Sequence, residues 1–197
     1  MALNNCPRAK RDPRSDGAWV YLTQLAGVRM WLDLEESRLE ALTPLLEASR
    51  ARVPLRIFTA GLALVRALTG DLEGALAGLA DIVDGLAELP YDWSRLPTLA
   101  LASEVCFRAR APIAAAALQR ELQPYAALGA VTHNAGLYLG SVQQALGWLA
   151  AARGRSADAI RHFESAYGVH AALRSPPWCA RSERAIAEVR TNRARAV

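Results

Sequence analysis

The side chains best suited to bind a ligand lie in one long uncharged stretch, residues 122 to 152. Imidazole, amide and phenol groups occur there with no Asp, Glu, Lys or Arg among them. Such groups can hold a neutral polar molecule through hydrogen bonds. One hypothesis is therefore a small-metabolite site formed by His133, Asn134, Tyr138 and Gln143. The alternative is helix packing, in which glycines allow close approach and Gln143 and Gln144 face solvent.

Motifs of the common enzyme classes are absent from the sequence. Its one lysine, Lys10, lies near the N-terminus, so a Walker A loop and a buried Schiff-base lysine are excluded. No H-E-x-x-H or G-x-S-x-G motif occurs. We therefore predict a protein that is not an enzyme, with no catalytic residue, metal or cofactor. A Ser, His and acid arrangement assembled by the fold stays open, and His170 is expected to be a hydrogen-bonded core residue.

The cysteines and the N-terminal sequence indicate the compartment. Cys6, Cys106 and Cys179 are odd in number and far apart, which is typical of reduced thiols, and Cys106 is expected to pack as a small hydrophobe. No apolar segment follows the N-terminal charges, so no secretory signal is predicted. The uncharged stretch is interrupted by Pro124 and by polar side chains, which argues against a membrane span. We expect a cytoplasmic protein.

The net charge of +4 is concentrated at the two ends of the chain. Residues 1–16 carry four basic and two acidic residues, and residues 171–197 carry six arginines and two glutamates, so their net charges are +2 and +4. The body between them is therefore at −2. A basic tail can attract an acidic partner or nucleic acid, although basic ends also serve solubility alone. Nucleic-acid binding is not expected, because no zinc-finger spacing or RNA-recognition motif accompanies the charge.

The elements that must position these residues repeat along the chain. Short breaks at Ser37-Arg38-Leu39, Gly70-Asp71-Leu72, Arg110-Ala111-Pro112 and Gly154-Arg155-Ser156 are separated by 33, 40 and 44 residues. After the breaks at residues 70 and 154, apolar residues follow the i, i+3, i+4, i+7 rule of an amphipathic helix. This spacing is typical of helical-repeat proteins. The predicted fold is all-α, a tetratricopeptide-like array of helical hairpins (an α-solenoid) with about eight to nine helices.

The predicted boundaries follow from the same pattern. Residues 1–16 are expected to form a disordered basic leader, residues 17–190 the repeat domain, and residues 191–197 a frayed basic tail. A loop is expected from residue 128 to 136. The helices are expected at residues 18–34, 39–52, 54–69, 71–89, 94–108, 112–125, 137–153 and 156–173, with a last one from residue 175.

Several segments resemble a known group of regulators. They are residues 89–107 (beginning Leu-Pro-Tyr-Asp-Trp), 122–126, 139–142, 159–166 and 177–181. Together they resemble the C-terminal tetratricopeptide-like region of large bacterial signalling ATPases that carry a LuxR-type DNA-binding domain or a nucleotide cyclase domain. The resemblance implies a helical superhelix that senses an inducer or regulates partner domains, as in transcriptional regulation. After Tyr125 the chain departs from the Gly-Arg-Asn-containing turn usual in that group.

The expected function is therefore a non-catalytic regulatory or scaffolding module for a protein or peptide. A concave surface formed by the first helix of each hairpin would bind the partner. Its predicted contacts are Arg29, Arg56, Arg66, Gln143 and Gln144. The alternative is the metabolite sensor described above, responding to a small-molecule inducer. A third hypothesis is an enzyme on a helical scaffold, and an uncapped first hairpin makes a homodimer plausible.

Overall fold

The computed structural model describes residues 39–132 and 137–195. The expected leader, the helix at 18–34, Arg29, His133 and Asn134 lie outside the described residues.

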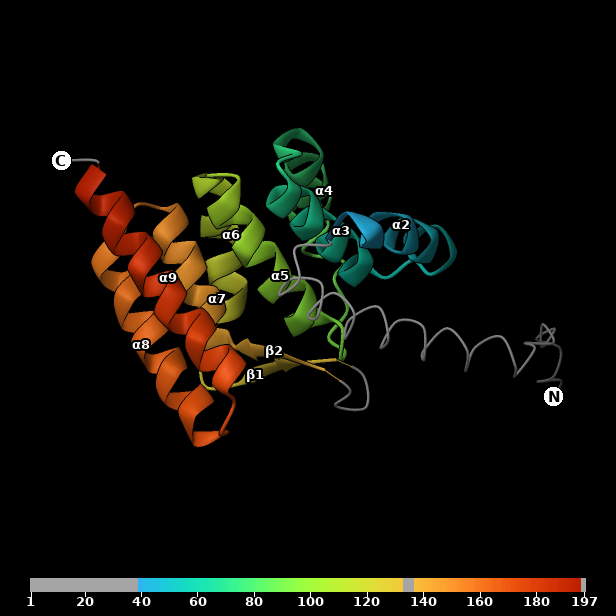
Figure 1. Ribbon diagram of the computed structural model, residues 1–197. Coiled ribbons are helices and arrows are strands. Elements are labelled where there is room, and N and C mark those ends of the chain that lie inside the picture. The colour runs from blue at the N-terminus through green and yellow to red at the C-terminus, as the bar shows by residue number, and fades with distance from the viewer. Residues whose placement is uncertain (1–38, 133–136, 196–197) are drawn as a thin grey trace, which may run out of the picture.

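The described residues form eight α-helices and one small antiparallel sheet, so the predicted all-α class is confirmed (Figure 1). A two-stranded sheet is the one departure from helix and loop in this part of the chain. The elements are η1 (Leu39–Leu42), α2 (Thr43–Arg52), α3 (Arg56–Thr69), α4 (Leu72–Asp84), α5 (Arg95–Arg108), α6 (Pro112–Leu122), η2 (Gln123–Tyr125), β1 (Gly129–Val131), β2 (Tyr138–Ser141), α7 (Val142–Ala152), α8 (Ser156–Ala172) and α9 (Pro176–Arg195).

The predicted breaks are tight turns between consecutive helices. Gly70, Arg110 and Gly154 each adopt a positive φ, of 95°, 52° and 73°. In the last two turns the next residue's N–H donates back to a carbonyl five residues earlier, Ala111 to Cys106 and Arg155 to Ala150, each at 2.9 Å. These bonds satisfy carbonyls that a helix end leaves unpaired. A fourth such turn at Arg174, with φ 50°, joins α8 to α9, between the helices predicted to end at residue 173 and to begin at residue 175.

Replacing Gly154 with alanine is expected to lower the stability of the protein. Alanine at this position would retain the left-handed turn at a cost of about 1–2 kcal/mol. Gly168, in the exposed face of α8, has no positive φ, and a Cβ added there would meet no atom within 4 Å. Gly168→Ala should therefore stabilise the helix by about 0.5–1 kcal/mol. Urea unfolding of the two variants is expected to move in opposite directions, and a stabilising Gly154→Ala would contradict the turn.

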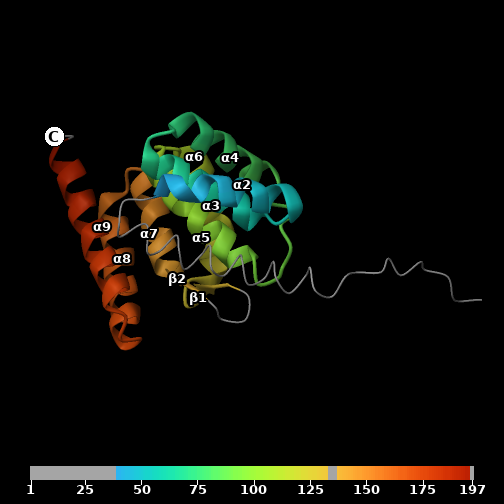
Figure 2. The same ribbon diagram turned by 45° about the vertical axis from the view of Figure 1, so that its right-hand side comes forward.

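The helices pack as consecutive hairpins. Helix α3 packs against α4, α5 against α6, and α7 against α8, while α3, α5 and α7 also contact one another in succession. Helix α9 lies against α8 at the end of the array (Figures 1 and 2). Residues 58–65 of α3 are all buried, which is typical of a helix covered on every side. A hairpin array is thus present in the described residues, and its winding into a solenoid stays a prediction.

The expected loop at 128–136 and the helix expected from residue 137 were wrong in part. Strands β1 and β2 pair antiparallel, with Gly129 opposite Ser141, and α7 begins at Val142. Gly140 has a φ of 97°, so the chain cannot be helical there, and the Ser141 side chain caps α7 by accepting the backbone N–H of Gln143 at 3.2 Å. The sheet lies beside one end of α5 and α7 (Figure 1).

Other helix boundaries moved for local reasons. Helix α2 begins at Thr43, four residues after the predicted start, because Pro44 favours the first turn of a helix. Helix α4 ends at Asp84 instead of residue 89, before Gly85. Helix α6 ends at Leu122, where the chain tightens into the 3-10 helix η2, because Pro124 has no N–H to donate to the Arg120 carbonyl. Helix α9 continues to Arg195, past residue 190. Among the described residues, no helix combines the length and apolarity needed to cross a membrane.

Candidate binding groove

Two of the three arginines predicted to contact a partner lie in the described residues, and both make ion pairs within the chain. Arg56, at the start of α3, contacts the Asp81 carboxylate of α4 at 3.1 Å. Arg66, at the other end of α3, contacts Glu47 at 3.3 Å and Asp71 at 3.6 Å. Ten residues of helix separate the two arginines by about 15 Å. They therefore tie α3 to its neighbours at two separate points, and a partner would have to compete with these carboxylates.

The predicted polar residues of the uncharged stretch also bond internally. The Gln143 amide donates to the Ala126 carbonyl at 3.0 Å, and its oxygen lies 2.7 Å from Nδ1 of His162. Gln144 is buried, and its oxygen accepts a hydrogen bond from Ser182 at 2.8 Å. The Tyr138 ring packs edge-on to His170 and Trp178, and burial raises the pKa of Tyr138 to about 12. The side chains of Gln143 and Tyr138, which were predicted to share a ligand site, thus contact different residues in the described structure.

His170 is a fully buried core residue, as predicted, and its hydrogen bonds set its tautomer. Its Nε2 accepts the backbone N–H of Ser141 at 3.1 Å, so the ring proton must be on Nδ1. Nδ1 then donates to the Ser182 hydroxyl at 3.1 Å, and that hydroxyl donates to Gln144. A histidine acting as a general base would instead accept the serine proton. This Ser and His pair is therefore oriented for structure, and it links α7, α8 and α9.

The buried histidine predicts how stability depends on pH. Burial lowers the pKa of His170 below its usual 6.5, so the unfolded chain binds a proton more readily than the folded one. Stability is then full above about pH 6.5 and declines as the pH falls below it. Burial also lowers the pKa of His162, so the variant His162→Gln removes that second contribution. Urea unfolding of that variant should show lower stability at pH 5.5 than at pH 7.5, and equal values would contradict the neutral, bonded imidazole.

Cys106 is buried as predicted, and desolvation raises the pKa of its thiol to about 12. The thiolate is the reactive form of cysteine, so this residue is a small hydrophobe in the core.

A buried carboxylate links α5 to α9. The side chain of Glu104 is 6% exposed and forms ion pairs with Arg181 of α9 and with Arg108 of its own helix. Arg108 continues the chain of contacts to Glu188 of α9 at 3.2 Å. This four-residue network joins α9 to α5, and it ends at the rim of a groove.

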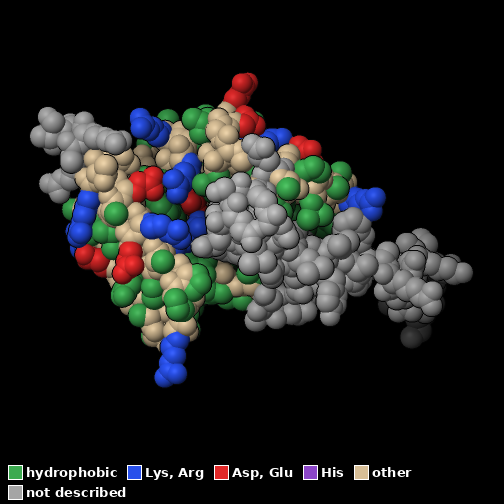
Figure 3. All heavy atoms as spheres, in the orientation of Figure 1, with side chains coloured by type: hydrophobic (Ala, Val, Ile, Leu, Met, Phe, Trp, Pro, Cys, Tyr) green, Lys and Arg blue, Asp and Glu red, His purple; other side chains and the backbone are tan. Residues whose placement is uncertain are grey.

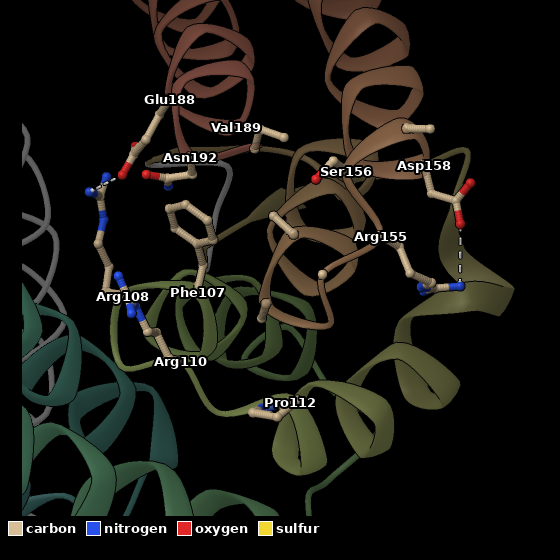
Figure 4. A pocket seen from close by; sticks show the side chains of 14 residues that line it. Phe107, Arg108, Arg110, Pro112, Arg155, Ser156, Asp158, Glu188, Val189 and Asn192 are labelled. Carbon is tan, nitrogen blue, oxygen red and sulfur yellow. Dashed lines mark hydrogen bonds and ion pairs between the residues drawn. The ribbon is translucent and has the colours of Figure 1, made fainter. Parts of the chain in front are cut away.

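The groove is a hollow of about 1220 Å³. Three segments that are distant in the sequence form it: the α5–α6 turn, the α7–α8 turn and the last turns of α9. In Figure 4 the Phe107 ring projects into the hollow toward α9, between the Arg108–Glu188 pair and the Arg155–Asp158 pair. The lining residues are Phe107, Arg108, Arg110, Pro112, Ala151, Ala152, Gly154, Arg155, Ser156, Ala157, Asp158, Glu188, Val189 and Asn192.

The groove has an excess of positive charge. Both of its carboxylates, Asp158 and Glu188, are already paired with Arg155 and Arg108, at 3.5 and 3.2 Å. Its third arginine, Arg110, is exposed and makes no ion pair with any described residue. Helices α6 and α8 both begin at the groove, and no side chain caps either N-terminus. The free N–H groups of these first turns can donate to an anion, whereas the partial charges of the two N-termini are offset by the C-termini of α5 and α7 at the same turns.

Charged side chains of both signs are grouped over the α9 side of the molecule in Figure 3. This mixture contrasts with the uniform basic surface expected for a protein that binds a nucleic-acid backbone.

Sequence reasoning missed the groove although it found two of its three segments. The breaks at Arg110-Ala111-Pro112 and Gly154-Arg155-Ser156 were predicted as turns, but their arginines were not among the predicted contacts. The signal that could have been used is the arginine at position 110, where the breaks at residues 70 and 154 have glycine. Arg110 adopts a positive φ, which is uncommon for residues other than glycine. The contribution of α9 depends on tertiary packing and has no sequence signal.

No protein-family model, curated protein or solved structure matches the chain. Within residues 39–132 and 137–195, no group of three His, Cys, Asp or Glu side chains is placed to hold a metal ion.

Proposed function

We propose that this chain is a non-catalytic helical-repeat module that binds an acidic segment of a partner protein in the groove. The observation that carries the proposal is the position of Arg110, an exposed cation without an ion pair among the described residues, beside two uncapped helix N-termini. Carboxylates are the side chains that such a surface favours. A regulatory role in bacterial signalling, and a cytoplasmic location, are further proposals that rest on the sequence alone.

The size and lining of the groove favour a peptide over a small neutral metabolite. Sites for small molecules usually measure about 300–1,000 Å³ and enclose their ligand, whereas this hollow is larger and lies open between turns. Phe107 offers an apolar surface inside it, and Ile113, at 88% exposed, lies on α6 directly after the lining residue Pro112. A segment that combines apolar and acidic side chains matches this surface.

Two arginines in equivalent turns allow a matched test. Arg110 and Arg174 are both exposed, both have a φ near 50°, and neither makes an ion pair with a described residue. Arg110 lines the groove, while Arg174 is not among its lining residues. With acetylated, amidated hexaglutamate as the probe in about 50 mM salt, Arg110→Glu should weaken binding tenfold or more, and Arg174→Glu less than twofold.

Calorimetric titration of the two variants and the wild type checks this prediction. Hexaglutamine serves as the uncharged probe and should not bind. Equal losses in both variants would show that net charge, rather than the groove, attracts the peptide. Tighter binding of an eight-nucleotide single-stranded DNA than of hexaglutamate would contradict the proposal and favour nucleic acid.

A further inference from the structure

Two arginine side chains of the α7–α8 turn converge on one neutral oxygen. Arg153 Nη1 donates to Oε1 of Gln119 at 2.6 Å, and Arg155 Nη2 donates to the same oxygen at 2.5 Å. Gln119 lies on α6, so the contact bridges the two hairpins. Like-charged guanidinium groups held this close repel each other, and an amide oxygen carries no net charge to offset the repulsion.

Nearby charges do not balance this pair. Asp158 is shared, at 3.5 Å from Arg155 and 2.5 Å from Arg161. Three arginines and one carboxylate leave a local charge of +2. The Nε atom of Arg155 is also buried and has no hydrogen-bond partner among the described residues. A buried polar atom without a partner costs free energy, so a donor remains for an incoming acceptor.

The position of this cluster connects it to the groove. Arg155 lines the groove and precedes the N-terminus of α8, a 17-residue helix with no side-chain cap. A carboxylate between Arg153 and Arg155 could accept charge-assisted hydrogen bonds from both guanidinium groups, which are stronger than bonds to an amide.

We propose that one glutamate or aspartate carboxylate of the bound segment occupies an anion subsite between Arg153 and Arg155, displacing the amide oxygen of Gln119. This inference rests on the proposed function, because it takes its ligand from the acidic segment. It assigns Gln119 the role of a neutral placeholder that keeps the two arginines together when the groove is empty.

The variant Gln119→Glu tests the subsite by placing a carboxylate there permanently. It should raise the Tm by about 2 °C or more, because the new charge pairs with both arginines. It should also weaken the binding of hexaglutamate tenfold or more, because the subsite is already filled. Gln123→Glu is the matched control: Gln123 is exposed just beyond the same helix, and its side chain makes no hydrogen bond to an arginine of the described residues. It should change neither quantity appreciably.

The outcomes separate the subsite from the groove. If the wild type binds hexaglutamate and Gln119→Glu binds it equally well, the subsite is wrong and the groove proposal stands. An unchanged or lower Tm in Gln119→Glu would also overturn the subsite, because the two guanidinium groups would then not share a position for an anion. If hexaglutamate binds neither the wild type nor Gln123→Glu, the proposed function fails, and the subsite loses its ligand with it.

Discussion

Replacing Glu104 with alanine is expected to lower the free energy of unfolding by about 3–5 kcal/mol. The Glu104 side chain is 6% exposed, and those of Arg181 and Arg108 are 15% and 30% exposed. Removing the carboxylate takes an ion-pair partner from two arginines that are partly shielded from water, and this loss costs free energy. Arg181 is the more buried of the two arginines, so the larger share of the cost falls on it. Urea unfolding of purified variants measures the effect.

Two further variants serve as controls for Glu104→Ala. Glu183 is exposed on the same helix as Arg181 and makes no ion pair with a described residue, so Glu183→Ala should change stability by less than about 0.5 kcal/mol. The double variant Glu104→Leu, Arg181→Leu should recover at least half of the loss, because apolar replacement of a buried pair is often neutral. A loss of less than about 1 kcal/mol in Glu104→Ala would mean that the network does not hold α9 in place.

Gly140→Ala is expected to destabilise the protein by about 2–5 kcal/mol, for two separate reasons. The φ of 97° at Gly140 is strained for any residue with a Cβ. An added Cβ would also lie 2.6 Å from Cζ3 and 2.7 Å from Cη2 of Trp178. Trp178 packs between Tyr138 and His170, at ring-centroid distances of 5.6 and 5.1 Å, so it cannot move without disturbing the buried histidine.

A double-mutant cycle separates the two causes. Phenylalanine at position 178 does not reach as far as the outer ring of tryptophan. Gly140→Ala should therefore cost less in a Trp178→Phe background than in the wild type, and the remaining loss reports the backbone strain. An equal loss in both backgrounds would show that the indole contact contributes nothing.

The sequence was sufficient to predict the hairpin arrangement, because its signal is local. Gly70, Arg110 and Gly154 mark turns that depend on a few neighbouring residues, and the amphipathic period between them defines the buried faces. The short strands escaped prediction because three or four residues carry too little pattern, and because the helix expected from residue 137 includes Gly140. The turn at Arg174 lies between the helices predicted to end at residue 173 and to begin at residue 175, where Pro176 and Pro177 mark the start of α9.

The site was less predictable than the fold. Arg56 and Arg66 were reasonable candidates as charged residues on one helix, and nothing in the sequence indicates that Asp81, Glu47 and Asp71 lie beside them. The groove combines residues about 80 positions apart, such as Arg108 and Glu188. Such a site exists only after α9 has packed against α8, so no local pattern encodes it.

The most direct test of the central claim is to locate the bound peptide by hydrogen exchange of backbone amides, with and without saturating hexaglutamate. Binding in the groove predicts slower exchange in residues 107–112 and 151–158, with no change in α3 or in the α8–α9 turn at Arg174. Protection of α3 around Arg56 and Arg66, with none in the two groove turns, would contradict the claim and support the surface first predicted from the sequence.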